Sequence, residues 1–231
     1  MLKGALLDFG GTIDTDGIHW MRMFEMAYQS CGLSADGLRD AYVHTERFLG
    51  RNAVIMPDFT LRDTLRQKIL LQLDYMCMKA DAEVILDFCY DYVAKNINTV
   101  SVPVLKTLSA RMPVVIVSNF YGNMRTVLRE FGIDGYFGAV VESAAVGVRK
   151  PDPEIFRLGA RSIGLEPEET VMTGDSPDKD IVPASSAGCR TVWLSGNGWS
   201  DDKECTADFI ISTFAELPYL PLISDTPRSS L

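Results

Sequence analysis

The residues with the clearest chemical potential in this sequence lie where short apolar runs end. Residues 5–7 are apolar, Asp8 follows them, and the next residues complete the pentapeptide DFGGT. A carboxylate at such a point could attack phosphorus and form an aspartyl-phosphate. The glycines would let backbone N–H groups approach a phosphate closely. The pentapeptide therefore indicates phosphate-transfer chemistry centred on Asp8.

Three later segments place further polar groups after apolar runs. The segment VVIVSN ends in Ser118 and Asn119, GVRKPDP contains Lys150, and GDSPDKD contains Asp175 and Asp180. Ser118 and Lys150 could hold phosphoryl oxygens, the lysine as a point charge. Carboxylates gathered around a hard divalent ion would suit Mg²⁺. Because ligands of parallel α/β sheets bind beyond the carboxyl ends of the strands, we expect these groups to meet in one site.

The apolar pattern predicts the elements that must position these groups. Helix-like stretches at residues 122–131, 152–163 and 178–187 alternate with apolar runs, which predicts βαβ units and a parallel sheet. The runs lack strict alternation, as expected for strands covered on both faces. The six predicted strands are residues 3–8, 113–117, 139–141, 170–172, 191–194 and 208–211.

Residues 17–95 follow a different pattern, without a convincing strand. Apolar residues recur there at three- and four-residue spacing, as at Leu61, Leu65, Ile69 and Leu73, which predicts amphipathic helices. About four helices are expected in a segment of this length. The segment is therefore predicted to be a helical insertion between the first strand and the rest of the sheet.

Composition limits the classes of partner. The 231 residues are 47% hydrophobic, and 22 basic against 31 acidic side chains give a formal charge of −9. This acidity argues against nucleic acid or an anionic membrane as the main partner, because both need basic patches. Five cysteines without a CxxC pair, and no evident secretory signal, favour a reduced, cytoplasmic setting. We expect a monomer or a homodimer.

The order of the motifs DFGGTID, VSN, RKPDPEIF and GDSPDKDI resembles that of the haloacid dehalogenase-like (HAD) hydrolase superfamily. The resemblance covers nearly the whole chain, and the helical insertion is similar to the C1-type cap of that family. It implies an α/β fold whose core is a Rossmann-like, doubly wound parallel sheet. The expected parts are a core at residues 1–15 and 96–223, a mobile all-helical cap at 16–95, and a frayed tail at 224–231.

The resemblance also implies roles for individual residues. Asp8 would be the nucleophile, with Ser118 and Lys150 as the other catalytic residues, all acting with Mg²⁺. The residues expected to bind the phosphorylated substrate are Gly11, Thr12, Ser118, Asn119 and Lys150. The expected metal ligands are Asp8, the backbone carbonyl of Gly10, Asp175 and Asp180, the last as a ligand or as the partner of one.

Gly10 departs from the phosphatases of that family, which carry an aspartate at this position. That aspartate protonates the leaving alcohol and then activates water, and glycine can do neither. Losing one such group costs roughly 10²–10⁴-fold in rate. Asp14 could stand in for the missing acid, or it could be a structural residue where the chain crosses from core to cap.

The sequence thus predicts a Mg²⁺-dependent phosphatase, a phosphoric monoester hydrolase, for a small phosphorylated metabolite. Its turnover is expected to be slow or restricted to good leaving groups. One alternative is an impaired phosphate-binding or regulatory protein derived from such an enzyme.

The other alternative is a dehalogenase or a phosphonate hydrolase. The last motif of the dehalogenases lacks the acid pattern, so Asp175 disfavours them. Phosphonate hydrolases form a Schiff base on a cap lysine. Residues 13–67 contain no lysine, and Lys68 and Lys79 are expected on solvated helix faces.

Overall fold

The computed structural model describes residues 2–196 and 206–224, and these residues form a six-stranded sheet in which every neighbouring pair is parallel. The strand order is β3-β2-β1-β4-β5-β6. Each strand overlaps a predicted one, so the predicted α/β class with a doubly wound parallel sheet is confirmed. The strands are β1 (Gly4–Leu7), β2 (Val114–Ser118), β3 (Ala139–Glu142), β4 (Thr170–Gly174), β5 (Arg190–Leu194) and β6 (Phe209–Ile211).

Helices cover both faces of the sheet. Leu6 of β1 packs in one buried cluster with α8 and α9, whereas Ala5 and Leu7 belong to a second cluster with α5 and α6. Neighbouring strand residues thus face opposite layers, which explains the unbroken apolar runs. The described core helices are α5 (Val102–Ser109), α6 (Met124–Glu130), α7 (Ser143–Val146), α8 (Glu154–Arg161), α9 (Val182–Ala187) and α10 (Pro221–Ser224).

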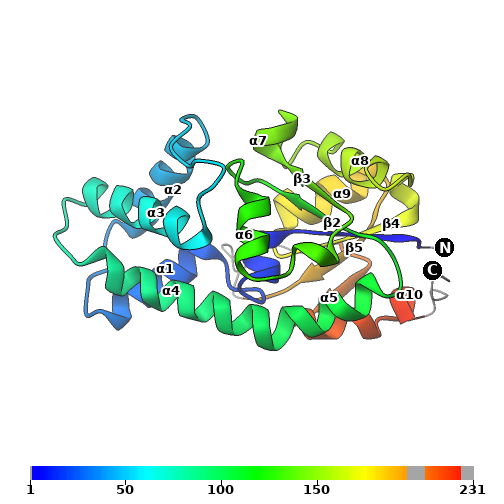
Figure 1. The fold of residues 1–231 in the computed structure, drawn as a ribbon, viewed down its shortest axis with the longest axis horizontal. Coiled ribbons are helices and arrows are strands. Elements are labelled where there is room, and N and C mark those ends of the chain that lie inside the picture. The colour runs from blue at the N-terminus through cyan, green and yellow to red at the C-terminus, as the bar shows by residue number, and fades with distance from the viewer. Residues whose placement is uncertain (1, 197–205, 225–231) are drawn as a thin grey trace.

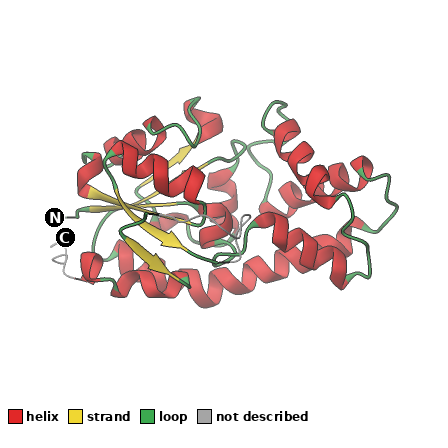
Figure 2. Cartoon of the chain, turned by 180° about the vertical axis from the view of Figure 1, so that it is seen from behind, coloured by secondary structure: helices red, strands yellow, loops and turns green. Residues whose placement is uncertain are grey.

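The insertion after β1 is helical, as predicted. It contains α1 (Trp20–Ser30), α2 (Leu38–Leu49), α3 (Leu61–Tyr75) and α4 (Ala82–Asn96). The predicted stripe of α3, from Leu61 to Leu73, is buried. Figures 1 and 2 show these helices grouped at one end of the sheet, beyond the carboxyl ends of the strands. Among the described residues, no helix combines the length and hydropathy that crossing a membrane would require.

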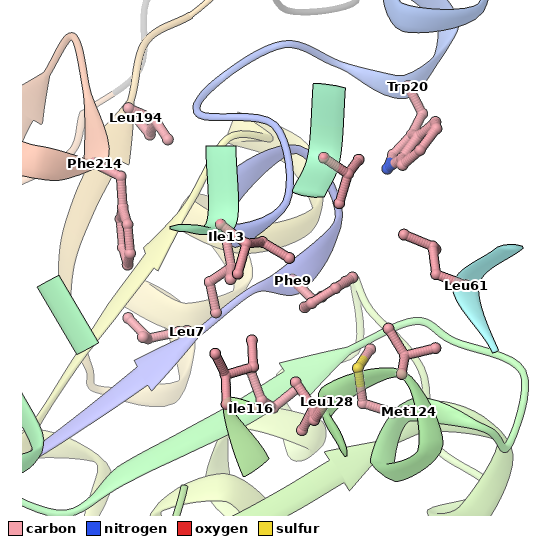
Figure 3. Close-up of a cluster of buried hydrophobic side chains, with 14 of the residues drawn as sticks. Leu7, Phe9, Ile13, Trp20, Leu61, Ile116, Met124, Leu128, Leu194 and Phe214 are labelled. Atoms are coloured by element: carbon pink, nitrogen blue, oxygen red, sulfur yellow. The ribbon is translucent and has the colours of Figure 1, made fainter. Parts of the chain in front are cut away.

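Two sets of hydrogen bonds hold the insertion against the core. At the crossing, Asn96 Nδ2 donates to the carbonyls of Ile13 and Asp14, at 3.1 Å each. Beside it, Glu130 of α6 accepts from the Leu61 N–H at 2.6 Å, and Asn123 Nδ2 donates to Thr64 Oγ1 at 2.8 Å. Figure 3 shows Phe9, Ile13 and Leu61 as members of one cluster of buried hydrophobic side chains.

The proposed division into core and cap stays a prediction. The expected boundary at residues 95 and 96 falls near the end of α4, and the wide turn Ile97–Ser101 then joins α4 to α5. The two helices run on into each other along the molecule (Figure 1). The expected frayed tail lies outside the described residues except for Ser224.

Candidate active site

Four charged side chains meet at the carboxyl ends of the central strands. Asp8 directly follows β1, Asp175 directly follows β4, and Lys150 lies in the loop after α7. Asp180 lies in the wide turn Pro177–Ile181 that precedes α9. Lys150 Nζ lies 2.6 Å from Asp8 Oδ1 and 2.5 Å from Asp180 Oδ1. All four residues are buried. The structure therefore brings the predicted lysine together with three of the predicted metal ligands, one of which, Asp8, is also the predicted nucleophile.

The three carboxylates fit a divalent cation. Each offers an oxygen atom, and these atoms lie within 4.8 Å of one another. Burial raises the pKa of Asp8 to about 6, and burial with the charges of Asp180 and Asp8 raises the pKa of Asp175 well above its usual range. One lysine opposes three acids, so the cluster retains negative charge that Mg²⁺ would neutralise.

Asp180 also has a structural task in this cluster. Its Oδ1 accepts from Lys150 Nζ, and its Oδ2 accepts from the Ser176 N–H at 3.1 Å. A carboxylate with both oxygens engaged orients its neighbours. It can contact a metal only through remaining lone pairs. Both roles proposed from the sequence, ligand or partner of a ligand, remain compatible with this geometry.

Asn119 clamps the loop that carries Lys150. The Asn119 side chain donates through Nδ2 to the Lys150 carbonyl at 3.0 Å and accepts from the Lys150 N–H at 2.8 Å. This reciprocal pair fixes the backbone from which the buried ammonium projects. Asn119 lines the same pocket as Ser118, so its predicted contact with substrate stays a prediction beside this positioning role.

The two glycines of DFGGT occupy different environments. Gly11 has φ +92°, and a Cβ there would lie 2.3 Å from Asp175 Oδ2, so only glycine fits. Its N–H donates to Asp14 Oδ1 at 2.7 Å, which uses the donor that was expected to face phosphate. Gly11 and Thr12 are not among the residues that line the pocket. Their direct contact with substrate stays a prediction that this geometry does not favour.

Trp20 and Asp14 occupy the space beside Gly10. A Cβ on Gly10 would lie 3.6 Å from the Trp20 indole and 4.0 Å from Asp14 Oδ2. Asp14 is buried, accepts from Trp20 Nε1 at 2.7 Å, and does not line the pocket. Burial raises the pKa of Asp14 to about 7. These contacts favour a structural role for Asp14 over that of a substitute acid.

A pocket of about 1160 Å³ opens onto the charged cluster. The core contributes Trp193, whose Nε1 donates to the Asp175 carbonyl at 3.0 Å, together with the predicted site residues. From the sequence, Trp193 and Trp199 are both expected to pack or to rim the site, and Trp199 lies outside the described residues. From the helical insertion come His19, Trp20, Tyr42, Glu46 and Lys68.

The protein-family sequence model of the haloacid dehalogenase-like hydrolases matches residues 2–188 of the chain. The chain belongs to this family. The match spans all four motifs and the helical insertion, so the resemblance inferred from DFGGT, VSN, RKPDPEIF and GDSPDKDI is confirmed.

Relatives of this HAD-like hydrolase include proteins named as phosphatases. It is 37% identical over 86 residues to a phosphoserine phosphatase of Thermus thermophilus, a match that covers 37% of this chain and 34% of that protein. The chain spans between about a third and a half of the length of the curated relatives it matches first.

Solved structures share the fold over nearly its whole length. The HAD-hydrolase YfnB of Bacillus subtilis, bound to magnesium, has a TM-score of 0.60 at 19% identity, and the match covers 96% of this chain and 98% of that one. The L-2-haloacid dehalogenase of Xanthobacter autotrophicus has a TM-score of 0.62 at 16% identity, with 95% and 98% covered. At these identities the two structures show the fold alone.

The prediction that Lys68 lies on a solvated helix face is wrong. In this HAD-like hydrolase Lys68 is buried and lines the pocket, with Nζ 2.8 Å from Glu46 Oε1. The contact is an ion pair without hydrogen-bond geometry. Lys68 follows Leu65 by three residues and precedes Gln72 by four, and both are buried. This helical spacing was the available signal that Lys68 shares the buried face of α3.

His19 is the N-cap residue of α1 and is neutral in the folded protein. Its Nδ1 accepts from the Met21 N–H at 3.2 Å, and burial, with the charge of Lys179, lowers its pKa to about 4. Because the folded pKa lies below the usual 6.5, protonation favours unfolding as the pH falls from 6.5 to 4. His19→Asn keeps a capping oxygen but cannot titrate.

We expect the free energy of unfolding, measured in urea, to fall more for the wild type than for His19→Asn between pH 7 and pH 4.5. The expected difference between the two declines is about 1–2 kcal/mol. Parallel pH profiles of the two proteins would contradict a half-buried histidine that folding keeps neutral. His44→Asn, at an exposed position of α2, is the matched control and should leave the wild-type profile unchanged.

Proposed function

We propose that this HAD-like hydrolase is a Mg²⁺-dependent phosphatase of a small phosphorylated metabolite, acting through an aspartyl-phosphate on Asp8. The observation that carries the proposal is the buried cluster of Asp8, Asp175 and Asp180 with Lys150 in contact. Its polar groups suit a phosphoryl group and a hard cation together. The phosphatase among its relatives supports the same class of reaction.

Each residue of the cluster has a defined task in this reaction. Lys150 donates to Asp8 and lowers its pKa against the effect of burial, which favours the ionised nucleophile. One Asp8 oxygen attacks phosphorus, the bond from phosphorus to the leaving oxygen breaks, and Lys150 and Ser118 face the transferred group. Water then attacks the aspartyl-phosphate and releases phosphate and Asp8.

The metal would be held by Asp8, Asp175, Asp180 and the carbonyl of Gly10. When bound, Mg²⁺ supplies positive charge that screens the carboxylates from the phosphate and stabilises the charge of the transition state. Position 10 is glycine, so no carboxyl group at this position can protonate the leaving oxygen. The proposal therefore includes a preference for leaving groups that need little protonation, such as a phenolate or a carboxylate.

The buried Lys68 of the helical insertion provides a test of the phosphonate-hydrolase alternative. A Schiff base requires a neutral amine, but Glu46 beside Lys68 raises the pKa of that ammonium against the opposing effect of burial. Lys68 is therefore held in its charged form and is a poor nucleophile. A charged Lys68 therefore argues against the phosphonate hydrolase and favours the phosphatase.

A panel of phosphate esters with and without Mg²⁺ tests the proposal. We expect Mg²⁺-dependent release of phosphate, with aryl and acyl phosphates turned over roughly 10²–10⁴-fold faster than alkyl phosphates, because alkoxides leave poorly without a proton. Equal, fast rates on both classes would show that another group supplies the proton. Hydrolysis of a haloacid without Mg²⁺, and of no phosphate ester, would favour the dehalogenase alternative.

A further inference from the structure

The helical insertion places a buried cation in the same pocket as the nucleophile. Lys68 projects from α3, and only 7% of its surface is exposed. Both Lys68 and Asp8 line the pocket of about 1160 Å³. The phosphoryl-transfer reaction described above gives Lys68 no task, because Lys150 already contacts the nucleophile.

The surroundings of Lys68 keep it charged and fixed. Glu46 Oε1 lies 2.8 Å from Nζ, and Tyr121 Oη donates to Glu46 Oε2 at 2.6 Å. Two aromatic rings flank the ammonium, with the Tyr121 centroid at 5.0 Å and the Trp20 centroid at 5.8 Å. Such faces attract a cation, so α3, α2 and the loop after β2 all constrain the position of Nζ.

This arrangement offers the pocket hydrogen-bond donors from the Lys68 ammonium. An ammonium carries three N–H groups, and Glu46 is its one ion-pair partner among the described residues. The second oxygen of Glu46 is taken by Tyr121. A group that binds here must therefore accept hydrogen bonds, and negative charge strengthens such bonds.

We propose that Lys68 binds a carboxylate of the substrate, so that the preferred substrate is a small phosphorylated carboxylic acid. The inference rests on the proposed phosphatase function and adds the identity of the second substrate group. A carboxylate fits better than a second phosphate, because Glu46 already balances the lysine. A phosphate dianion would add two charges beside a buried lysine that a half-buried carboxylate already compensates.

The mouth of the pocket supports an anionic substrate. Arg47, Arg51 and Arg149 line it, are exposed, and form no ion pair with other described residues. In a chain with a formal charge of −9, three such arginines at one opening raise the local concentration of anions. They attract any anionic substrate, whereas the buried Lys68 would select the carboxylate.

The test compares two probes that share a three-carbon chain and a terminal phosphate. 3-Phosphoglycerate carries a carboxylate where glycerol 3-phosphate carries a hydroxymethyl group. For the wild type we expect kcat/KM to favour 3-phosphoglycerate by at least about 10-fold. In Lys68→Met the ratio should fall to near one, chiefly through a higher KM for 3-phosphoglycerate, and Lys68→Arg should retain part of it.

Two further variants separate recognition from folding. Lys68→Met leaves the half-buried Glu46 carboxylate without its partner, so the double variant Glu46→Gln/Lys68→Met removes both charges together. It should lose the preference while remaining folded. Lys79→Met, at an exposed position of the same insertion, is the matched control and should retain the wild-type ratio. If Lys68→Met slows both probes equally, the pair is structural and the inference is overturned.

Binding by calorimetry gives a readout that does not depend on turnover. With Asp8→Asn and Mg²⁺, 3-phosphoglycerate should bind at least about 10-fold more tightly than glycerol 3-phosphate, and adding Lys68→Met should remove the difference. Equal affinities would overturn the inference even if the wild type hydrolyses aryl phosphates. A Lys68-dependent affinity difference without hydrolysis of any phosphate ester would support the carboxylate site and reject the phosphatase.

Discussion

Asp8→Asn is expected to reduce phosphatase turnover by about 10⁴-fold or more, because it removes the atom that forms the covalent bond to phosphorus. Asparagine has nearly the same shape, and its carbonyl oxygen can still accept from Lys150 Nζ, which lies 2.6 Å from Asp8 Oδ1. The loss would therefore report nucleophilicity rather than a displaced lysine.

The fold should survive this substitution. Asp8 is one of three buried carboxylates that repel one another, and burial raises its pKa to about 6. Removing its charge at pH 7 relieves part of that repulsion. We expect the unfolding temperature of Asp8→Asn without Mg²⁺ to equal or exceed that of the wild type. Asp74→Asn, at an exposed position of α3, is the matched control for stability and activity.

Rapid quenching followed by mass spectrometry checks the chemistry directly. The wild type should gain the mass of one phosphoryl group on the peptide that contains Asp8, and Asp8→Asn should not. Because glycine at position 10 cannot activate water, the second step is expected to be slow and the phosphoenzyme to accumulate. Wild-type turnover that persists in Asp8→Asn would place the nucleophile elsewhere and reject the aspartyl-phosphate.

The sheet and its charged cluster were predictable from the sequence for a local reason. Apolar runs covered on both faces are short and unbroken, and each is followed at once by a polar residue such as Asp8 or Asp175. Parallel strands then bring those ends to one edge. For the charged cluster contributed by the core, the place of a residue after a strand in the sequence therefore predicted its place in the site.

The half of the pocket contributed by the insertion was harder to predict. Glu46 and Lys68 are separated by 21 residues and by a turn between α2 and α3, and their pairing depends on how two helices pack. Tyr121 comes from the loop after β2, so its hydrogen bond to Glu46 depends on the docking of the insertion on the core. Sequence spacing carries no information on either distance.

The loop DFGGT shows a similar limit. Its glycines look equivalent in the sequence, but the carboxylate of Asp175 leaves no room for a Cβ on Gly11, whereas a Cβ on Gly10 would make ordinary contacts with Trp20. The Gly11 N–H, expected to face phosphate, donates to Asp14. These differences arise from residues distant in the sequence or from the path of the loop, which no local pattern specifies.

Gly10→Asp is expected to increase the turnover of alkyl phosphates by roughly 10²–10⁴-fold, the contribution of one general acid-base group. The backbone at Gly10 has φ −78° and ψ 116°, which any residue adopts without strain. A Cβ would lie 3.6 Å from Trp20, an ordinary contact. The substitution therefore adds a proton donor without requiring the loop to move.

The surroundings of position 10 should also tune the new carboxyl group. Asp14 Oδ2 would lie 4.0 Å from the added Cβ, and a like charge with burial raises the pKa of a carboxyl group. A pKa moved toward neutrality is what a group needs to protonate a leaving alcohol and then accept a proton from water. The gain should be largest for alkyl phosphates and small for aryl phosphates, whose leaving groups need little protonation.

Steady-state rates for Gly10→Asp, Gly10→Asn and the wild type decide between the enzyme and the binding protein. Asparagine matches aspartate in shape but has no carboxyl proton, so a gain seen with aspartate alone assigns the effect to proton transfer. An inert wild type with an active Gly10→Asp variant would favour a binding or regulatory protein derived from a phosphatase. A wild type already fast on alkyl phosphates, and not improved by aspartate, would mean that another donor reaches the leaving oxygen and that Gly10 does not limit the reaction.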